Sequence, residues 1–389
     1  MARTGRSTPI SFFLIFILLV CVHSNANAQC VGSPLTFGLQ GPSKLAQTPL
    51  GNLIVSETGT PDPNSGRVSI VDLAGNRRSL LEGLPSGINA LGDPVGTSGV
   101  FLKGRTLYVL SGEGNDTIAG PIPGTELPNP NPNSPILSSV LAVHLSAEAE
   151  KITTGFVLTS ADHQALKDGQ TLTFSNGGGD KITVSLVADF PDYVPDPLPF
   201  FTPNVRHSNP FGITGIGNQL YVADGGRNLV FKIDADTGAF ASLAVFPPVP
   251  NPLPFGPPVI EAVPDSVRAY NGQLYVTLLR GFPFVPGLGA AVIVDPLTGA
   301  VSPLISGLAS AIDILPVKTK GATSYLTLEI STDFLAGNPG RLQRFATPAG
   351  PGVTCEPLIG PSNMVRDDKT GTLYITSIFT GAIIQVSGQ

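Results

Sequence analysis

His207 is the residue whose type and position point most directly to catalysis, because it stands two positions before Asn209 at the start of an apolar run. A neutral histidine can act as a general base toward water or a hydroxyl group. The sequence has no GxSxG motif and no Ser-His-Asp set that spacing alone can assign. We therefore keep His207 as a candidate base, with a structural role in its loop as the alternative.

Polar residues recur at the ends of the apolar runs. Six precede a run: Ser43, Thr97, Asn209, Asp265, Asp313 and Asn363. Six follow one: Glu57, Glu113, Asp224, Arg280, Glu329 and Ser377. Calcium takes about six to eight oxygen ligands, and once bound it can polarise the carbonyl of a lactone or ester. The candidate calcium ligands are Glu57, Asn209, Asp265 and Asp313. The alternative is that these side chains satisfy loop backbone groups and buried waters.

Phenylalanine and proline are concentrated in three loops: FPDYVPDPLPFFTP from Phe190, FPPVPNPLPFGPP from Phe246, and GFPFVPG from Gly281. Proline stiffens the backbone, so an exposed phenylalanine loses little entropy on binding. The loops predict an apolar lip for a small apolar molecule or a partner protein. The alternative is that the phenylalanines fold inward and cover the core. The candidate ligand-binding residues are Asn209, Asp224, Asp265, Arg280, Phe282, Phe284, Asp313, Glu329 and Asn363.

One short phrase recurs along the chain and predicts the elements that hold these residues. A turn leads into an apolar strand centred on Ile54, Tyr108, Tyr221, Tyr275, Tyr325 and Tyr374. The spacings are 54, 113, 54, 50 and 49 residues, which is typical of propeller blades of four antiparallel strands. We predict an all-β, six-bladed β-propeller. Seven blades are the alternative, because the gap of 113 residues is about two periods.

We interpret the long gap as an insertion in blade two, at about residues 147–181. Residues 138–146 are predicted as the third strand of that blade and residues 181–190 as the fourth. The segment SADHQALKDGQ, from Ser160, is predicted as a short helix or turn within the insertion.

The two ends of the chain are predicted to meet in the last blade. Residues 361–389 supply only three strands, so a strand at 33–40 completes that blade and closes the ring. Cys30 precedes this strand, and Cys355 is expected on the outer strand of blade five. We predict a disulfide between Cys30 and Cys355.

Strand direction alternates within a blade and sorts the loops onto two faces. The longest connections share one face, the long-loop face: 111–135, 191–209, 247–264, 281–289 and 332–339. Long loops on a rigid scaffold usually carry the functional site, so we expect the site on this face.

The first 28 residues predict export. Arg3 and Arg6 precede an apolar run at 10–22, and Ala26-Asn27-Ala28 supplies a small-x-small cleavage pattern. The run has 13 residues, whereas a membrane span needs about 20. We therefore predict a signal peptide at 1–28, one domain at 29–389, no membrane span, and a secreted or periplasmic protein. The net charge is −6 without a Lys/Arg cluster, which argues against nucleic-acid binding.

The run from Ser208 that begins SNPFGITGIGNQLYVADGGRNLVFKID, together with VPDSVRAYNGQLYV, LLRGFPFVPG and SGLASAIDIL, resembles the ScyD/ScyE family. The resemblance is specific over about 189–330 and implies an exported propeller similar to NHL and gluconolactonase proteins. It does not imply a reaction. The sequence departs from the family pattern where VPDSV replaces VPTSV, which introduces Asp265, and where LLRGFPF replaces LTGFPF.

Three functional hypotheses follow. The first is a non-catalytic binding or scaffold propeller for an apolar small molecule or an extracytoplasmic partner protein. The second is a calcium-dependent lactonase or esterase. The third, by analogy of fold alone, is an accessory protein in the assembly of an aromatic secondary metabolite. We favour the first, because no catalytic set is evident in the sequence.

Overall fold

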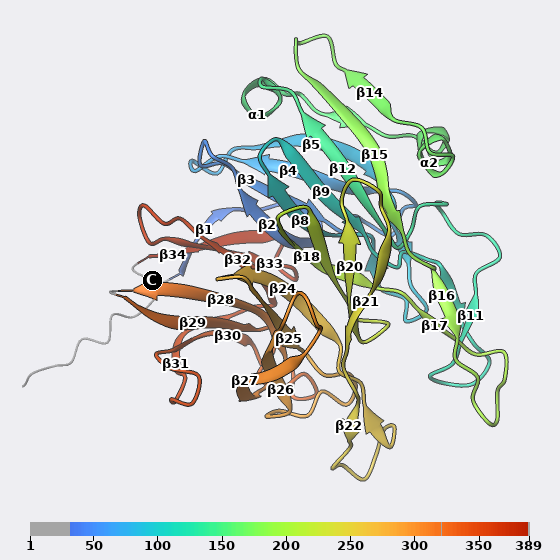
Figure 1. Ribbon diagram of the computed structural model, residues 1–389, viewed down its shortest axis with the longest axis vertical. Helices are drawn as coiled ribbons and strands as arrows, with labels where there is room; N and C mark the ends of the chain where they lie inside the picture. The colour runs from blue at the N-terminus through green and yellow to red at the C-terminus, as the bar shows by residue number, and fades with distance from the viewer. Residues whose placement is uncertain (1–31, 320, 388–389) are drawn as a thin grey trace, which may run out of the picture.

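Six antiparallel sheets form the blades of a propeller (Figure 1). The computed structural model describes residues 32–319 and 321–387. Blade one contains β2 (Pro42–Gln47), β3 (Leu53–Glu57), β4 (Gly66–Val71) and β5 (Arg77–Leu84). Blade two contains β8 (Thr97–Lys103), β9 (Thr106–Ser111), β12 (Ser139–Leu145) and β15 (Lys181–Asp189). Blade three contains β18 (Pro210–Ile216), β19 (Gln219–Asp224), β20 (Leu229–Asp234) and β21 (Phe240–Val245).

The remaining three blades complete the ring. Blade four contains β24 (Pro264–Tyr270), β25 (Gln273–Leu278), β26 (Gly289–Val294) and β27 (Val301–Leu308). Blade five contains β28 (Ala311–Thr319), β29 (Ala322–Glu329), β30 (Gly340–Phe345) and β31 (Val353–Leu358). Blade six contains β32 (Pro361–Arg366), β33 (Leu373–Ser377), β34 (Ala382–Val386) and β1 (Gly32–Thr36). The innermost strands contact one another in the closed order β2, β8, β18, β24, β28, β32 and back to β2.

The predicted closure is confirmed. β1 pairs antiparallel with β34, and Gly32 lies opposite Val386. Blade six therefore contains strands from both ends of the described chain, in the order β1, β34, β33 and β32. The six-bladed prediction is confirmed over the seven-bladed alternative.

The 113-residue gap includes four additional elements between β12 and β15 of blade two. It contains α1 (Ala149–Ile152), β13 (Phe156–Val157), α2 (Ser160–Lys167) and β14 (Leu172–Ser175). β14 becomes a fifth strand on blade two, while β13 pairs parallel with β5 of blade one. Figure 1 shows α1, α2 and β14 at one outer edge of the propeller. Leu166 of α2 is fully buried in the core cluster that blades one and two share, so the insertion holds these two blades together.

The burial pattern explains why the repeat was visible in the sequence. The second strand of each blade packs between two neighbouring blades, and every residue of β3 and β33 is buried. Such strands need a continuous apolar run rather than an alternating one. Outer strands face solvent, and β21 exposes four of its six residues, which is why they gave weaker signals.

The Asp-x-x-Thr-Gly turns also have a structural role. Asp234 Oδ1 accepts hydrogen bonds from the Asp236 and Thr237 amides, at 3.1 and 2.9 Å. Asp295 makes the same contacts with the Leu297 and Thr298 amides, at 2.8 Å each. These carboxylates cap their own turns, as Asp does in Asx-turns.

The glycine that ends such a turn packs against the preceding blade. Gly299 has φ +73°, and a Cβ there would lie 1.9 Å from the Leu243 carbonyl oxygen in β21. Gly272 has nearly the same φ, +74°, with no atom within 4 Å of the Cβ position. A substitution at Gly272 therefore measures only the cost of a left-handed backbone. A substitution at Gly299 adds the cost of displacing the neighbouring blade.

We expect Gly299→Ala to lower the free energy of unfolding by about 3 kcal/mol, because it adds overpacking to a positive φ. The matched control Gly272→Ala should lower it by only about 1 kcal/mol. Urea unfolding monitored by circular dichroism measures both values. Equal losses in the two variants would contradict the close packing of this turn on blade three.

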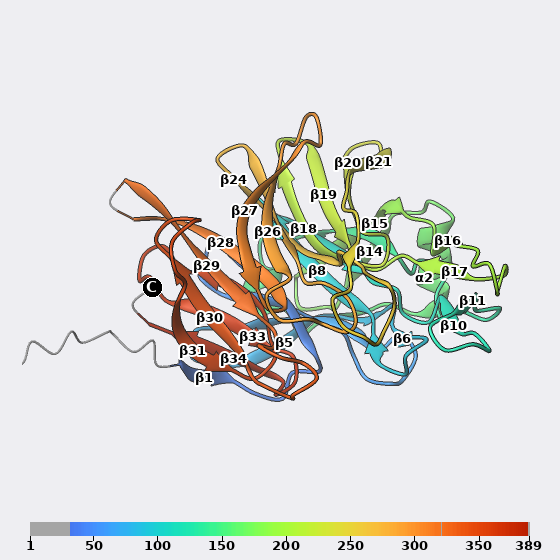
Figure 2. The same cartoon turned by 90° about the horizontal axis from the view of Figure 1, so that it is seen from below.

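The long connections are folded rather than irregular. Three of them form two-stranded ribbons: β10 (Thr117–Ala119) with β11 (Glu126–Pro128), β16 (Tyr193–Pro195) with β17 (Val205–His207), and β22 (Val249–Pro250) with β23 (Val259–Ile260). The connection between blades one and two forms a fourth ribbon, β6 (Gly87–Ile88) with β7 (Pro94–Val95). Figures 1 and 2 both show β11, β16 and β17 side by side beyond the blades. The long-loop face is therefore built from hydrogen-bonded ribbons.

Two predictions fall wholly or partly outside the described residues. The signal peptide at 1–28 and Cys30 lie there, so export and the disulfide remain predictions. Cys355 does lie on β31, the outer strand of blade five, where the sequence placed it. Within residues 32–319 and 321–387, no helix is both long and apolar enough to span a membrane.

Candidate functional site

A pocket of about 430 Å³ opens on the long-loop face beside blades three and four. Its lining comes from the ribbons and turns of three consecutive blades. Glu126 comes from the β10–β11 ribbon, His207 from the end of β17, Glu261 from the connection to blade four, and Phe282 from the loop after β25. The repeat positions these segments, because each one follows a second strand or precedes an innermost strand.

His207 stands between two glutamates. Its Nε2 lies 2.9 Å from Glu113 Oε2, and its Nδ1 lies 2.8 Å from Glu126 Oε2. Burial alone would lower the pKa of His207, but Glu113 and Glu126 outweigh it and raise that pKa well above its ordinary value. At neutral pH the ring is therefore an imidazolium, which has no lone pair to accept a proton. Contacts with two carboxylates therefore favour a structural cation over a general base at His207.

More carboxyl groups surround this histidine. Asp116 is 2% exposed, and burial, reinforced by the charge of Glu113, raises its pKa to about 9. Burial also raises the pKa of Asp192 to about 6. Asp116 thus carries a proton at neutral pH, and His207 supplies one positive charge among several acids.

The wall of the pocket is a hydrogen-bonded network. Arg206 Nε lies 3.2 Å from Asp196 Oδ2, and Arg206 Nη2 lies 3.2 Å from Glu261 Oε1. Asn228 Nδ2 donates to Glu261 Oε2 at 2.5 Å. Asn204 Oδ1 accepts from the Glu126 amide at 2.9 Å. These bonds join the loops of three blades, so the pocket is formed before any ligand enters.

Some phenylalanines of the three loops are buried against the core, and others are exposed. Phe190 and Phe246 are buried, at 2% and 3% exposure, and Phe190 stacks on Phe231 with ring centroids 4.4 Å apart. Phe284 packs on Phe334 at 4.8 Å. Phe282 remains 49% exposed and lines the pocket. Phe200 and Phe255 are also exposed on this side, at 67% and 48%. Part of the set covers the core, and part is exposed on the long-loop face.

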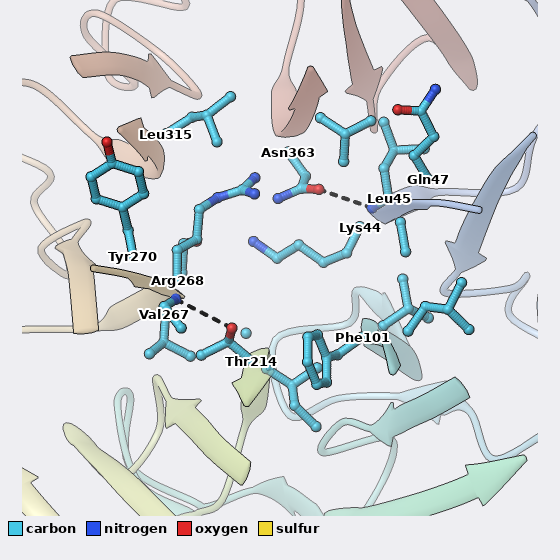
Figure 3. Close-up of a pocket in the computed structure, with 18 of the residues that line it drawn as sticks. Lys44, Leu45, Gln47, Phe101, Thr214, Val267, Arg268, Tyr270, Leu315 and Asn363 are labelled. Atoms are coloured by element: carbon cyan, nitrogen blue, oxygen red, sulfur yellow. Dashed lines mark hydrogen bonds between the residues drawn. The ribbon is translucent and has the colours of Figure 1, made fainter. Parts of the chain in front are cut away.

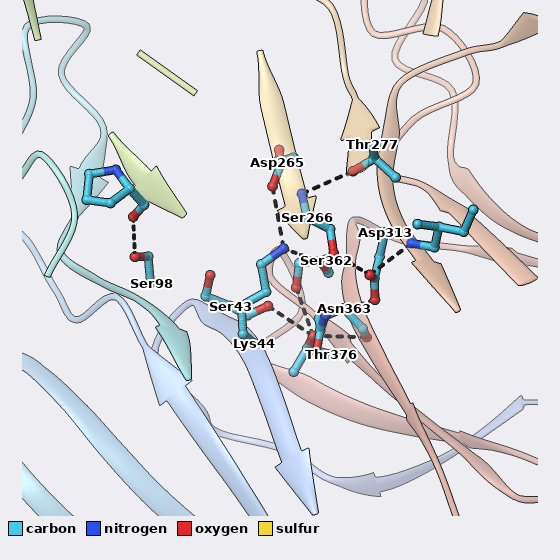
Figure 4. A network of polar contacts seen from close by, with 12 residues as sticks. Ser43, Lys44, Ser98, Asp265, Ser266, Thr277, Asp313, Ser362, Asn363 and Thr376 are labelled. Atoms are coloured by element: carbon cyan, nitrogen blue, oxygen red, sulfur yellow. Dashed lines mark hydrogen bonds and ion pairs between the residues drawn. The ribbon is translucent and has the colours of Figure 1, made fainter. Parts of the chain in front are cut away.

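The candidate residues at the propeller axis are held by basic partners and amides (Figure 4). Asp265 Oδ1 lies 3.4 Å from Lys44 Nζ. Asp313 accepts from Ser266 Oγ at 2.7 Å, Arg268 Nε at 2.8 Å and Asn363 Nδ2 at 2.8 Å. Burial raises the pKa of Asp265 to about 6. Burial also acts upward on Asp313, but the Arg268 guanidinium and neighbouring donors bring the pKa of Asp313 below its ordinary value.

The remaining candidates lie farther out or have their own partners. Glu57 binds Arg67 at 2.6 Å, and Glu329 binds Arg341 at 2.6 Å. Asp224 Oδ1 accepts from the amides of Asn209 and Arg227 at 2.8 and 2.9 Å. Arg280 Nε donates to the Leu288 carbonyl at 3.1 Å. Burial raises the pKa of Asp224 to about 6 and lowers that of Arg280.

The predicted calcium ligands do not fit a calcium ion. Glu57, Asp265 and Asp313 each bind a different Arg or Lys, and Asn209 lines the outer pocket instead of the axis. An ammonium and a guanidinium therefore stand where the ion would need to be. Throughout the described part of the chain, no group of three or more His, Cys, Asp and Glu side chains is arranged to hold a metal. We derive no step through calcium.

Comparisons with known proteins show which fold this chain shares and nothing about its function. No family model and no curated protein sequence matches the chain. An auxiliary nutrient binding protein from Bacteroides thetaiotaomicron is 9% identical, with a TM-score of 0.51, and the match covers 90% of this chain and 69% of that one. A protein of unknown function from the same organism is 10% identical, with a TM-score of 0.50, and the match covers 92% and 75% of the two chains. At such identities the likeness shows the β-propeller fold alone, and the ScyD/ScyE resemblance stays a prediction.

Proposed function

We propose that this chain is an exported binding propeller that takes a small molecule into the pocket on the long-loop face. The observation that carries the proposal is the preformed pocket of about 430 Å³ with the half-exposed Phe282 in its lining. Binding pockets of this kind combine apolar walls with a few fixed polar groups. Export follows from the predicted signal peptide at 1–28.

The excess of acidic groups in the pocket favours a ligand whose polar part donates hydrogen bonds. Its lining contains three carboxylates, Glu126, Asp196 and Glu261, but only two basic groups, Arg206 and His207. Each basic group already lies between two of the surrounding acids. The pocket therefore offers surplus acceptors to a ligand that carries amine or hydroxyl donors.

The apolar lining selects the rest of the ligand. Leu91, Val263 and Phe282 contribute apolar surface around the polar wall. An aromatic ring can pack edge-on or offset against Phe282, and such pairs contribute about 0.5–1.5 kcal/mol beyond burial. We therefore propose a ligand with a flat apolar body and a donor group at one end. A protein with the same fold carries the name of an auxiliary nutrient binding protein, and a binding role agrees with that name.

A partner protein is a second candidate for the same face. Phe200, Phe255 and Leu91 are exposed there, the last at 83%, and exposed apolar groups of this kind mark interaction sites. The hydrolase hypothesis has no such support, because three of its four predicted metal ligands are paired with Lys or Arg and the fourth, Asn209, lies apart from them.

Tyramine is a suitable probe for the proposed pocket, because it joins a phenol ring to an ammonium group. We expect saturation-transfer NMR to detect its binding to the mature protein. Phe282→Ala should weaken that binding about tenfold, since it removes the aromatic contact and its buried area. Phe37→Ala is the matched control, because Phe37 is 63% exposed and does not line the pocket. Equal binding by wild type and Phe282→Ala would argue against this pocket as the site.

A further inference from the structure

A second cavity lies between the innermost strands at the axis of the propeller (Figure 3). It has a volume of about 290 Å³ and is lined by the innermost strands of all six blades. It continues into an outer mouth of about 700 Å³, lined by the last residues of β2, β24, β28 and β32. Innermost strands begin at the long-loop face, so this mouth opens on the opposite face.

The inner cavity is lined by two cations and no carboxylate. Figure 3 shows the side chains of Lys44 and Arg268 pointing toward one another across it. Their carboxylate partners, Asp265 and Asp313, lie near the beginnings of β24 and β28 and are not part of the lining. Both cations therefore line the cavity, while the Arg268 guanidinium also donates to Asp313 and to the Met364 carbonyl.

Lys44 is weakly paired for a buried cation. It is 4% exposed, and its Nζ lies 3.4 Å from Asp265 Oδ1 and 3.3 Å from the Ser362 carbonyl. Charge-assisted hydrogen bonds are normally about 2.7–2.9 Å long. Burial lowers the pKa of Lys44 despite the attraction of Asp265, so a further anion in the cavity would stabilise its charged form.

The outer mouth is also lined mainly by cations among its charged residues. It is lined by Arg268, Lys318 and Arg366 together with one acid, Asp368, which binds Arg366 at 2.9 Å. The whole chain carries a net charge of −6, so this is a local reversal of sign. A charged cleft with low-dielectric walls concentrates ions of opposite charge and speeds their entry.

The rest of the lining mixes polar side chains, such as Gln47, Thr214 and Asn363, with apolar and aromatic ones. Phe101, Tyr270 and Leu315 line the inner cavity, and Figure 3 shows them around the two basic side chains. We propose that the axial cavity binds a small organic carboxylate with a flat apolar body, entered from the face opposite the long-loop pocket. The carboxylate lies between Arg268 and Lys44, and the body packs on the apolar and aromatic side chains of the lining.

The test uses 4-hydroxyphenylacetate, which has the phenol ring of tyramine but the opposite charge. We expect isothermal titration calorimetry at low ionic strength to show one site per mature chain. Arg268→Gln should weaken binding at least about tenfold, the loss of one charge-assisted hydrogen bond. Lys318→Gln combined with Arg366→Gln, both at the mouth, should weaken it about threefold to tenfold, and added salt should reduce that difference.

Matched variants keep the proposal falsifiable. Arg268→Gln removes the partner of Asp313, so the double variant at the mouth decides the question if Arg268→Gln does not fold. Lys103→Gln is the control, because Lys103 is an exposed cation at the end of β8 outside both cavity linings. The proposal is overturned if the carboxylate does not bind, or if the double variant and Lys103→Gln have the same affinity. Phe282→Ala should leave this affinity unchanged, which separates this site from the pocket of the proposed function.

Discussion

Replacing Asp313 with alanine is expected to lower the free energy of unfolding by about 3–5 kcal/mol, the largest effect among single substitutions considered for this chain. Asp313 is fully buried and accepts hydrogen bonds from Ser266, Arg268 and Asn363, and from two backbone amides. These donors come from blades four, five and six. The substitution would leave the partly buried Arg268 guanidinium without its counter-charge at the centre of the ring.

A double-mutant cycle tests this account of the axis. If the cost comes from the stranded charge, then Asp313→Ala combined with Arg268→Met should be more stable than Asp313→Ala alone. Asp236→Ala, in an exposed turn, serves as the control and should change stability by less than about 0.5 kcal/mol. Chemical unfolding of wild type, Asp313→Ala, Arg268→Met, the double variant and the Asp236→Ala control gives the values. An Asp313→Ala protein as stable as wild type would show that the axial ion pair does not hold the blades together.

The second large effect concerns Asp116. Its pKa is about 9 in the folded chain because of burial and the nearby Glu113 charge, whereas an unfolded aspartate has a pKa near 4. Between these values the folded state holds a proton that the unfolded state has released. Stability must therefore fall as pH rises through this window, by up to about 1.4 kcal/mol per pH unit for one proton. His207 acts in the same direction, since its raised pKa contributes stability that is lost as pH rises above about 6.5.

Asp116→Asn should remove the larger part of this dependence, because asparagine resembles the protonated acid. We expect the variant to be more stable than wild type by about 2–4 kcal/mol at pH 7 and nearly equal to it at pH 4. Thermal unfolding at a series of pH values measures the difference, with Asp368→Asn, at an exposed carboxylate, as the control. A wild-type stability that rises from pH 5 to pH 8 would contradict the protonated state of Asp116.

The sequence predicted the fold because of where the second strands lie. Ile54 and Tyr221 belong to strands enclosed between blades, and that enclosure demands the apolar runs that revealed the period. The closing strand was predictable because the last phrase lacked a fourth strand. The parallel pairing of β13 with blade one was not, because two residues of strand give no periodic signal.

The candidate site was only partly predictable. Phe282 was found because its loop has an unusual composition, and His207 because it stands beside a strand start. Lys44 and Arg268 were not predicted, because both lie inside strands and not at a strand boundary. The Lys44 partner, Asp265, lies 221 residues away in the sequence. Glu126 was missed for a similar reason, since only the folding of β10 and β11 into a ribbon brings it to His207.

The most direct test of the proposed function is a crystal structure of the mature protein soaked with tyramine. We expect the phenol ring against Phe282 and the ammonium group within hydrogen-bond distance of Glu126 or Glu261. Tyramine density at the axial cavity instead, or no density in crystals whose protein binds tyramine in solution, would contradict the assignment of the long-loop pocket as the binding site.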